Sequence, residues 1–323
     1  MNRTGTGRRA ALGIGLAALA GALSGCSDGP APGPPLRLAT GPEGGPYNAF
    51  GKALARAVTA SGRGVRLEPV TTAASVDNLR LLREGSVELA LAMADVAEDA
   101  ALGREPFTAP LTTLTALARV YVNYTHLLVP ADGPVHDVGA LAGRPVAAGA
   151  AGSGVQVVAG RILRDPGRAG GAEAPRERAL GLAESVTALR EGSVDALFWA
   201  GGVPTPALAA LARERPLRFL SLDDRVGPLR ERHGPVYSAV TLPAGVYGLT
   251  EPVGTVGVGN YLLARRDVPD GAVGELLRVV FDRWRELMGE VTAGARLEPR
   301  FAISTGRVPL HPGAVAHYRS VYD

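Results

Sequence analysis

Residues with catalytic chemistry are scattered in this chain of 323 residues. No two histidines have the spacing of metal ligands, and no thiolate accompanies them. The stretch Gly45–Gly51 resembles a phosphate loop, but Ala53 replaces the required Ser/Thr and the glycines are one residue too far apart. Gly152-Ser153-Gly154 lacks the G-x-S-x-G spacing of a nucleophile elbow. The sequence therefore predicts no enzyme, no metal site and no cofactor.

Two glycine-rich loops suit a different chemistry, the binding of an anion through the backbone. Gly44-Gly45 and Gly152-Ser153-Gly154 each come just before a predicted helix. Glycines let backbone N–H groups approach a ligand closely, and a helix N-terminus favours an anionic group such as a carboxylate. Each loop alone is equally consistent with a tight turn that holds no ligand. Their occurrence in both halves of the chain favours binding.

The hexapeptide LREGSV occurs twice, at Leu82–Val87 and Leu189–Val194, and predicts the same helix-to-strand corner in both places. Gly85 and Gly192 suit the left-handed conformation that ends a helix, and each valine then starts a strand. We interpret the hexapeptide itself as scaffold, because a well-made corner explains it fully.

The strands after these corners end where α/β proteins bind their ligands, beyond the carboxyl ends of parallel strands. The first strand ends at Met93-Ala94-Asp95 and the second at Trp199-Ala200-Gly201-Gly202. Two such edges, one from each lobe, predict a cleft between them. Ser75 is expected to cap the helix before the first corner, and Ser185 starts the helix before the second.

Apolar β-prone runs alternate with amphipathic helical patterns along most of the chain, which predicts α/β layers with largely parallel sheets. The β-rich run LTALARVYVNYTHLLVP is expected to form two strands that cross from one lobe to the other. The segment Ala272–Met288 has apolar residues at i, i+3, i+4 and i+7, and predicts one long helix whose aromatic stripe is core.

The first 26 residues have the pattern of an export signal. Three arginines precede an uncharged apolar run, and Leu23-Ser24-Gly25-Cys26 follows it, which resembles the lipobox of bacterial lipoproteins. The apolar run is too short for a comfortable membrane span. We therefore expect residues 1–25 to be a signal peptide, Cys26 to carry the lipid, and the Pro/Gly-rich residues 26–35 to be a tether.

The formal net charge of +3 comes from the export signal, because residues 1–25 contain three arginines and no acid. The remainder is formally neutral and has no basic stripe with interleaved aromatic residues, so a nucleic-acid partner is not predicted. With 46% hydrophobic and 20% charged residues, the composition is ordinary for a folded globular protein.

A series of motifs resembles one protein family over roughly residues 36–323. In order, the motifs are TGPEGGPYNAFGKALA, ASVDNLRLLREGSVELALAMADVA, GAAGSGV, EGSVDALFWAGGVPTPAL, LPAGVYG and PLHPGAVAHYRSVY. Each is weak alone, but the combination resembles the TAXI-type (TRAP-associated extracytoplasmic immunogenic) solute-binding proteins of TRAP transport systems.

The resemblance implies an α/β, two-lobe periplasmic-binding-protein fold of the second type, with residues 36–127 and 261–323 in lobe 1 and 128–260 in lobe 2. It also implies capture of a small organic anion for TRAP-type membrane permease subunits, with glutamate-like ligands in relatives. The export signal agrees with an extracytoplasmic, membrane-anchored location. A ligand-sensing lipoprotein of the same fold that feeds a membrane histidine kinase is the alternative, and the sequence does not separate the two.

Carried over motif by motif, the resemblance assigns ligand contact to ten residues. They are Gly45, Tyr47, Ser75, Asn78, Met93, Asp95, Ser153, Gly154, Trp199 and Tyr247. Asp95 is equally consistent with a strand-end acceptor that holds its loop, and Trp199 with plain core.

This chain departs from the family pattern at three presumed cleft positions. Pro46, Met93 and Val155 stand where the family usually has Thr, Gln and Thr. Because a site built to hydrogen-bond a zwitterion depends on its polar groups, these replacements predict a less polar carboxylate than glutamate.

Overall fold

The computed structural model describes residues 34–164, 173–291 and 299–322. The predicted signal peptide, the lipid site Cys26 and most of the predicted tether lie outside these residues. None of the helices in the described ranges combines the length and apolar character that a membrane crossing requires.

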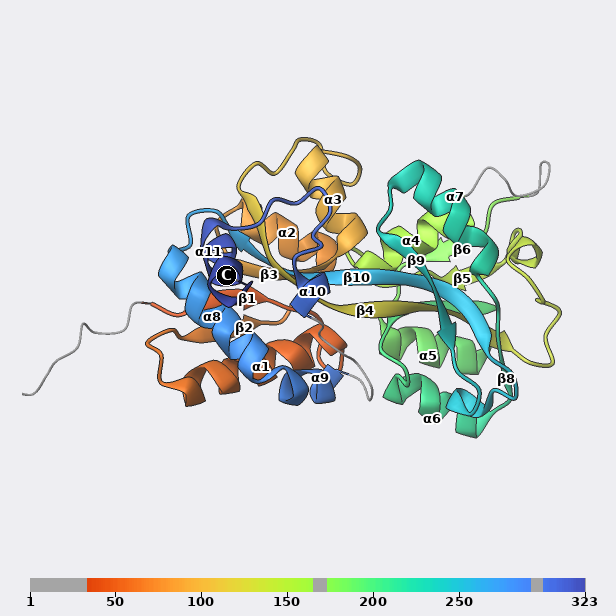
Figure 1. The fold of residues 1–323 in the computed structure, drawn as a ribbon. Coiled ribbons are helices and arrows are strands. Elements are labelled where there is room, and N and C mark those ends of the chain that lie inside the picture. Colours follow the sequence, from red (N-terminus) through yellow and green to blue (C-terminus); the bar gives the residue numbers. More distant parts are fainter. Residues whose placement is uncertain (1–33, 165–172, 292–298, 323) are drawn as a thin grey trace, which may run out of the picture. The chain divides into compact units, whose positions relative to one another are not determined.

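Two long antiparallel strands, β4 (Leu114–Pro130) and β10 (Val253–Arg265), connect the two halves of the fold (Figure 1). In the first half β10 pairs with β3 (Leu89–Met93), and in the second half β4 pairs with β7 (Ala196–Gly201). The run Leu114–Pro130 is therefore one strand of 17 residues, and the expectation of two strands was wrong.

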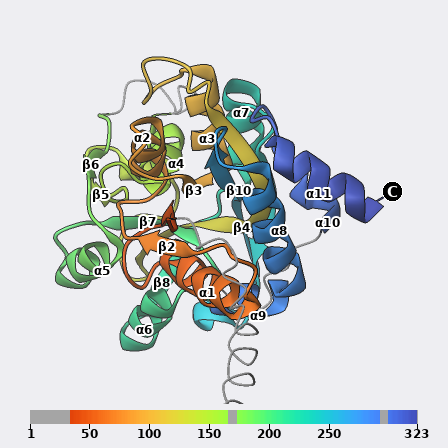
Figure 2. The same ribbon diagram turned by 90° about the vertical axis from the view of Figure 1, so that its left-hand side faces the viewer.

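The first half contains the parallel strands β1 (Leu36–Ala39), β2 (Leu67–Val70) and β3 between two layers of helices. Figure 2 shows α2 and α3 on one side of these strands and α1, α8 and α9 on the other. The helices are α1 (Pro46–Ser61), α2 (Ser75–Arg83), α3 (Ala94–Leu102), α8 (Asp270–Asp282), α9 (Trp284–Val291), α10 (Pro299–Ala302) and α11 (Pro312–Tyr322).

The second half repeats this layering around the parallel strands β7, β5 (Pro145–Ala147) and β6 (Arg176–Arg178). Strands β8 (Leu217–Phe219) and β9 (Tyr237–Leu242) pair antiparallel with β4 and β10. The helices are α4 (Gly154–Leu163), α5 (Leu182–Glu191), α6 (Pro206–Glu214), α7 (Asp223–His233) and the short η1 (Gly139–Leu141) and η2 (Val246–Gly248). The whole sheet has the order β2-β1-β3-β10-β4-β7-β5-β6 and is mixed.

The two LREGSV corners have the same construction, as the sequence predicts. Gly85 and Gly192 have φ of 74° and 73°, the left-handed conformation that ends each helix. The acid after each corner then forms an ion pair with an arginine at the start of the neighbouring strand. Glu88 binds Arg37 at 2.6 Å, and Asp195 binds Arg144 at 3.2 Å.

Details of three helix boundaries differ from the expectation. Ala74 is the N-cap of α2, so Ser75 is its first residue rather than its cap. Helix α5 begins at Leu182 after Gly181, so Ser185 lies inside the helix, where the bond from Gly181 N–H to Glu184 secures the first turn. The segment Ala272–Met288 is divided between α8 and α9 at Arg283.

Asn78 of α2 connects the end of β1 to the middle of β3. Its Nδ2 group donates to the backbone oxygens of Thr40 and Leu91, both at 2.6 Å, and its Oδ1 accepts from the hydroxyl of Thr72 at 2.5 Å. Asn78 is fully buried, so these groups have no access to water. The residue is a structural tie between β1, β3 and α2.

We expect Asn78→Ala to lower the free energy of unfolding by about 3 kcal/mol, because several buried polar groups lose their partner together. The matched control is Asn48→Ala on α1. Asn48 is also buried but donates only long bonds, at 3.3 and 3.5 Å, and should cost about 1 kcal/mol. Chemical denaturation compares the two. Equal losses would contradict the assignment of Asn78 as a tie.

Candidate functional site

A small cavity of about 60 Å³ lies where the first turns of four helices, α1, α2, α4 and α5, come together. Two of these helices belong to each half of the fold. Seven of the ten residues predicted to bind ligand line this cavity: Gly45, Tyr47, Ser75, Met93, Ser153, Gly154 and Trp199. Asn78, Asp95 and Tyr247 are not among its lining residues.

The two glycine-rich loops lie where the sequence predicts them, each before a helix that begins at the cavity. Gly45 is the N-cap of α1, and Ser153 is the N-cap of α4, with its hydroxyl accepting from Gln156 N–H at 3.2 Å. Neither α1 nor α4 has an acidic residue in its first turn. Their positive ends are therefore not neutralised locally, and both suit an anion.

The start of α2 is already occupied by a backbone group from the other half. The carbonyl oxygen of Gly152 accepts hydrogen bonds from Val76 N–H at 3.0 Å and from Asp77 N–H at 3.2 Å. Next to this contact, a Cβ atom on Gly154 would lie 2.6 Å from the sulfur of Met93 and 2.8 Å from the hydroxyl oxygen of Ser75. Only glycine allows the two halves to approach this closely.

The cavity lining among the described residues contains no charged side chain. Its walls are mostly apolar, and its polar side chains are Tyr47, Ser75, Asn123, Ser153 and Ser185. The hydroxyl of Tyr47 donates to Asn260 Oδ1 at 2.5 Å, and burial raises the pKa of Tyr47, which keeps the phenol neutral. An anion here would be stabilised by backbone N–H groups and neutral dipoles.

Trp199 forms part of the apolar wall and is held by a hydrogen bond from its Nε1 to Thr205 Oγ1 at 3.0 Å. Tyr247 does not line the cavity and reaches Trp199 through Thr205. Its hydroxyl accepts from Thr205 N–H at 2.6 Å, and its ring stacks on Phe219 with centroids 4.9 Å apart. Tyr247 therefore lies behind Trp199, as a support rather than a residue of the cavity wall.

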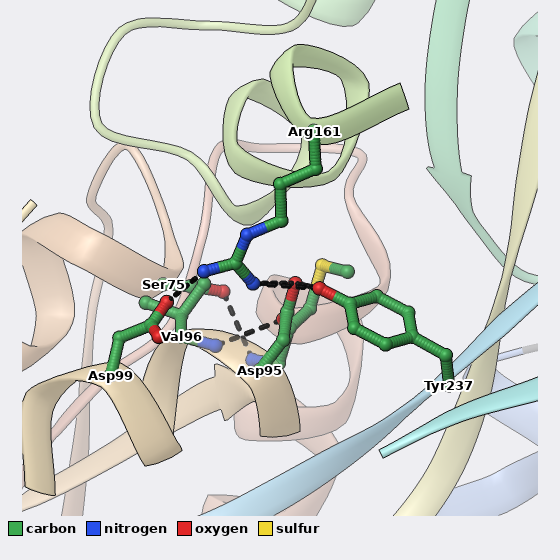
Figure 3. Close-up of polar contacts among 7 residues, drawn as sticks. Ser75, Asp95, Val96, Asp99, Arg161 and Tyr237 are labelled. Carbon is green, nitrogen blue, oxygen red and sulfur yellow. Dashed lines mark hydrogen bonds and ion pairs between the residues drawn. The ribbon is translucent and has the colours of Figure 1, made fainter. Parts of the chain in front are cut away.

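Asp95 does not line the cavity and belongs to a buried ionic cluster that joins the two halves (Figure 3). Arg161 of α4 binds Asp95 at 3.3 Å and Asp99 at 2.5 Å, both on α3. The hydroxyl of Tyr237, on β9, lies 2.6 Å from Arg161 and 2.9 Å from Asp95. The alternative prediction for Asp95, a strand-end hydrogen-bond acceptor that holds its loop, fits this position. We call Arg161, Asp95, Asp99 and Tyr237 the latch.

Two acids share one guanidinium in the latch, and this affects their protonation. Burial raises the pKa of Asp99 to about 6, with the negative charge of Asp95 adding to the rise and Arg161 opposing it. Burial likewise raises the pKa of Asp95, against the effect of Arg161. The latch therefore takes up a proton more readily than exposed carboxylates would.

Sequence reasoning missed Asn123 and Arg161. Asn123 lies in the middle of β4, within the apolar run VYVNYTHLLVP. An asparagine inside such a run is unusual for a buried strand, and that was the available signal. Arg161 is one of many arginines, and nothing local to the sequence pairs it with acids 62 and 66 residues away.

Comparison with known proteins identifies the family. The NMT1-like family matches residues 38–321. The chain belongs to the NMT1-like family. Among solved structures, MatC from Rhodopseudomonas palustris with bound malate is 18% identical, with 88% of this chain and 97% of that chain covered and a TM-score of 0.54. This likeness shows a shared fold.

Two further structures show weaker likeness. A TctC solute-binding protein from Polaromonas is 16% identical, with 89% of this chain and 98% of that chain covered and a TM-score of 0.49. The periplasmic aliphatic sulphonate binding protein SsuA from Escherichia coli is also 16% identical, with 89% of this chain and 84% of that chain covered and a TM-score of 0.46. This NMT1-like protein has an α/β fold with a mixed sheet and shares that fold with MatC.

Arg161→Met should lower the free energy of unfolding at pH 7 by about 3–5 kcal/mol, because it leaves two buried carboxylates without their partner. Arg164→Met on the same helix is the matched control. Arg164 pairs with Glu177 at 2.6 Å, but its side chain is 63% exposed, so we expect a loss of at most about 1 kcal/mol. Urea denaturation measures both. A loss for Arg161→Met no larger than the control's would contradict the latch.

Asp99→Asn should remove part of the pH dependence of stability. Between the ordinary value of 3.8 and about 6, the folded protein binds a proton at Asp99 that the unfolded chain does not. The stability of the wild type relative to Asp99→Asn should therefore increase as pH falls from 7 to 4.5, and stay constant above pH 7. Denaturation curves at each pH test this. A difference that is constant from pH 4.5 to 7 would contradict the raised pKa.

Proposed function

We propose that this NMT1-like protein is the extracytoplasmic, lipid-anchored solute-binding subunit of a TRAP-type secondary transporter, of the TAXI type. It captures a small organic anion less polar than glutamate and delivers it to the membrane permease. The export signal with Cys26 supports the anchor, and the ordered series of TAXI-like motifs supports the transporter class.

The observation that carries the proposal is the pair of open helix starts at the cavity. Helices α1 and α4 come from different halves, and each begins there with no acid in its first turn. A carboxylate between them is stabilised by both dipoles and both sets of free N–H groups. The bound malate of MatC, which shares the fold, is an organic anion and supports the same ligand class.

The apolar lining argues against glutamate as the preferred ligand. An ammonium group needs an acidic or strongly polar partner when it is buried. No acid lines the cavity in the described residues, and Asp95, two residues after the lining residue Met93, is held in the latch. Pro46, Met93 and Val155 offer no side-chain oxygen or nitrogen in its place.

Ligand capture takes place by a hinge motion at β4 and β10, the two long strands that join the halves. The proposed lobes, residues 36–127 with 261–323 and residues 128–260, meet inside these strands. Closure brings the Gly152 carbonyl onto α2 and Arg161 onto Asp95 and Asp99, as observed. Ligand between α1 and α4 then adds the binding energy that favours the closed arrangement.

Titration calorimetry with purified protein tests the proposal with aliphatic, keto and hydroxy acids against glutamate. We expect at least one non-amino acid to bind about tenfold or more tightly than glutamate, and saturating ligand to raise the melting temperature. Tighter binding of glutamate would contradict the less polar ligand. Absence of binding by every organic anion, with native mass spectrometry showing no co-purified anion, would contradict the function.

A matched pair of glycine variants locates the site. Gly154→Ala places a methyl group against Met93 and Ser75, so it should weaken ligand binding at least tenfold. Gly227→Ala, in α7, meets no atom within 4 Å and should leave binding unchanged. Equal affinities for the two variants would place the ligand elsewhere.

A further inference from the structure

The hydroxyl of Thr205 does not serve the helix that it precedes. Thr205 is the N-cap of α6, where a threonine hydroxyl ordinarily accepts from the first turn, yet its side chain makes no such bond. The hydroxyl instead accepts from Trp199 Nε1–H at 3.0 Å and donates to the backbone oxygen of Gly202 at 2.7 Å. The one polar group of the Trp199 side chain is therefore occupied by the protein, and the indole offers the cavity an apolar surface.

Gly201 limits the position of the same indole from the side of the strand. A Cβ atom on Gly201 would lie 2.5 Å from Nε1 and 3.0 Å from Cε2 of Trp199. The indole therefore lies directly against the backbone of β7, in a space that only glycine leaves open. Gly201 and Thr205 together determine where the indole lies at the cavity.

Two further buried side chains hold Thr205 from behind. The hydroxyl oxygen of Tyr247 accepts from Thr205 N–H at 2.6 Å, which leaves its own proton for His126 Nε2 at 3.2 Å. His126 is fully buried, and burial lowers the pKa of its imidazole to about 4. The imidazole is therefore neutral at pH 7 and has one ring nitrogen that accepts.

These contacts close on themselves. His126 of β4 pairs directly with Trp199 of β7, and opposed residues of antiparallel strands have their side chains on the same face of the sheet. Tyr247 has φ of 56°, which is uncommon for a bulky residue and persists where surrounding contacts fix it. We call His126, Tyr247 and Thr205 the indole support.

We propose that the indole support fixes Trp199 as a rigid apolar wall that sets how long a carbon chain the ligand can have. None of its three members lines the cavity, so they are positioning residues that act through Trp199. The inference rests on the proposed function, in which an organic anion occupies the cavity. A wall that cannot move makes one extra methylene costly, whereas a mobile wall accommodates it.

The indole N–H signal in NMR spectra of the purified, ligand-free protein tests the support. The chain contains two tryptophans, so a Trp284→Phe background leaves Trp199 as the only indole. Thr205→Val, which keeps the shape but lacks the hydroxyl, should shift this signal upfield and speed its exchange with solvent about tenfold or more. Thr205→Ser, the matched control, keeps the hydroxyl and should retain the wild-type signal.

His126→Leu and His126→Gln extend the test to the far end of the support. Leucine removes the acceptor for Tyr247, whereas the glutamine oxygen can replace Nε2. We expect a smaller upfield shift for His126→Leu and a signal close to the wild type for His126→Gln. An unchanged signal in whichever of Thr205→Val and His126→Leu folds would overturn the support, and so would equal changes in Thr205→Val and Thr205→Ser.

Calorimetry with straight-chain monocarboxylates from acetate to octanoate tests the selectivity. In the wild type, we expect the acid one methylene longer than the best ligand to bind about tenfold more weakly. In Thr205→Val this ratio should fall to about threefold or less, while Thr205→Ser should keep the wild-type ratio. The same ratio in Thr205→Val as in the wild type would overturn the role of the support in selectivity.

The outcomes separate this inference from the proposed function. Binding of the acids with unchanged selectivity in Thr205→Val would overturn the inference and leave an organic-anion carrier. Binding of none of them, together with failure of the wider anion panel, would contradict the proposed function and with it the role in selectivity. The Trp199 signals are recorded without ligand, so they decide on the indole support in either case.

Discussion

The contact between α4 of the second half and the helices α2 and α3 of the first half determines the rest of the site. Arg161 supplies the ionic part of this contact, and the Gly152 carbonyl supplies the part made by the backbone. Buried charges carry a large desolvation penalty, so the latch is stable only while all its members are in place. It therefore specifies one relative position of α3 and α4, and with it the width of the cavity beside them.

The latch also explains why the cavity is uncharged. Met93 and Asp95 are two residues apart at the junction of β3 and α3, and they face different sides of the contact between the halves. Met93 contacts the cavity, while Asp95 is committed to Arg161. The charged side chains of this region are thus used to hold the halves together. An anionic ligand must then depend on backbone dipoles, which are fixed in direction and cannot be neutralised by a change of protonation.

The local features of the site could be predicted from the sequence. A glycine just before a helix and a left-handed glycine at the end of a helix each have a direct conformational cause. Both therefore appear in the sequence as short patterns, around Gly45, Gly85 and Gly154. The α/β class follows from periodicity in the same way. The ten candidate residues came from the family resemblance carried over motif by motif, and seven of them line one cavity.

The remaining features depend on contacts between distant parts of the chain. Whether the Asn78 side chain faces a ligand or the backbone is decided by the carbonyl oxygens of Thr40, after β1, and Leu91, in β3, which no local pattern around Asn78 reveals. Asp95 and Arg161 are 66 residues apart in different halves, so their pairing appears only when the halves meet. The break between α8 and α9 at Arg283 similarly interrupts an apolar pattern that reads as continuous.

The repeated corners suggest how ligand preference is divided within the site. Both corners start strands that bring a large apolar residue to the cavity, Met93 at the end of β3 and Trp199 two residues before the end of β7. In the proposed function, the starts of α1 and α4 provide the polar contacts to the ligand. Substitutions of Met93 or Trp199 should therefore alter which carbon chain the protein accepts, while the helix starts that bind the carboxylate in the proposed function remain.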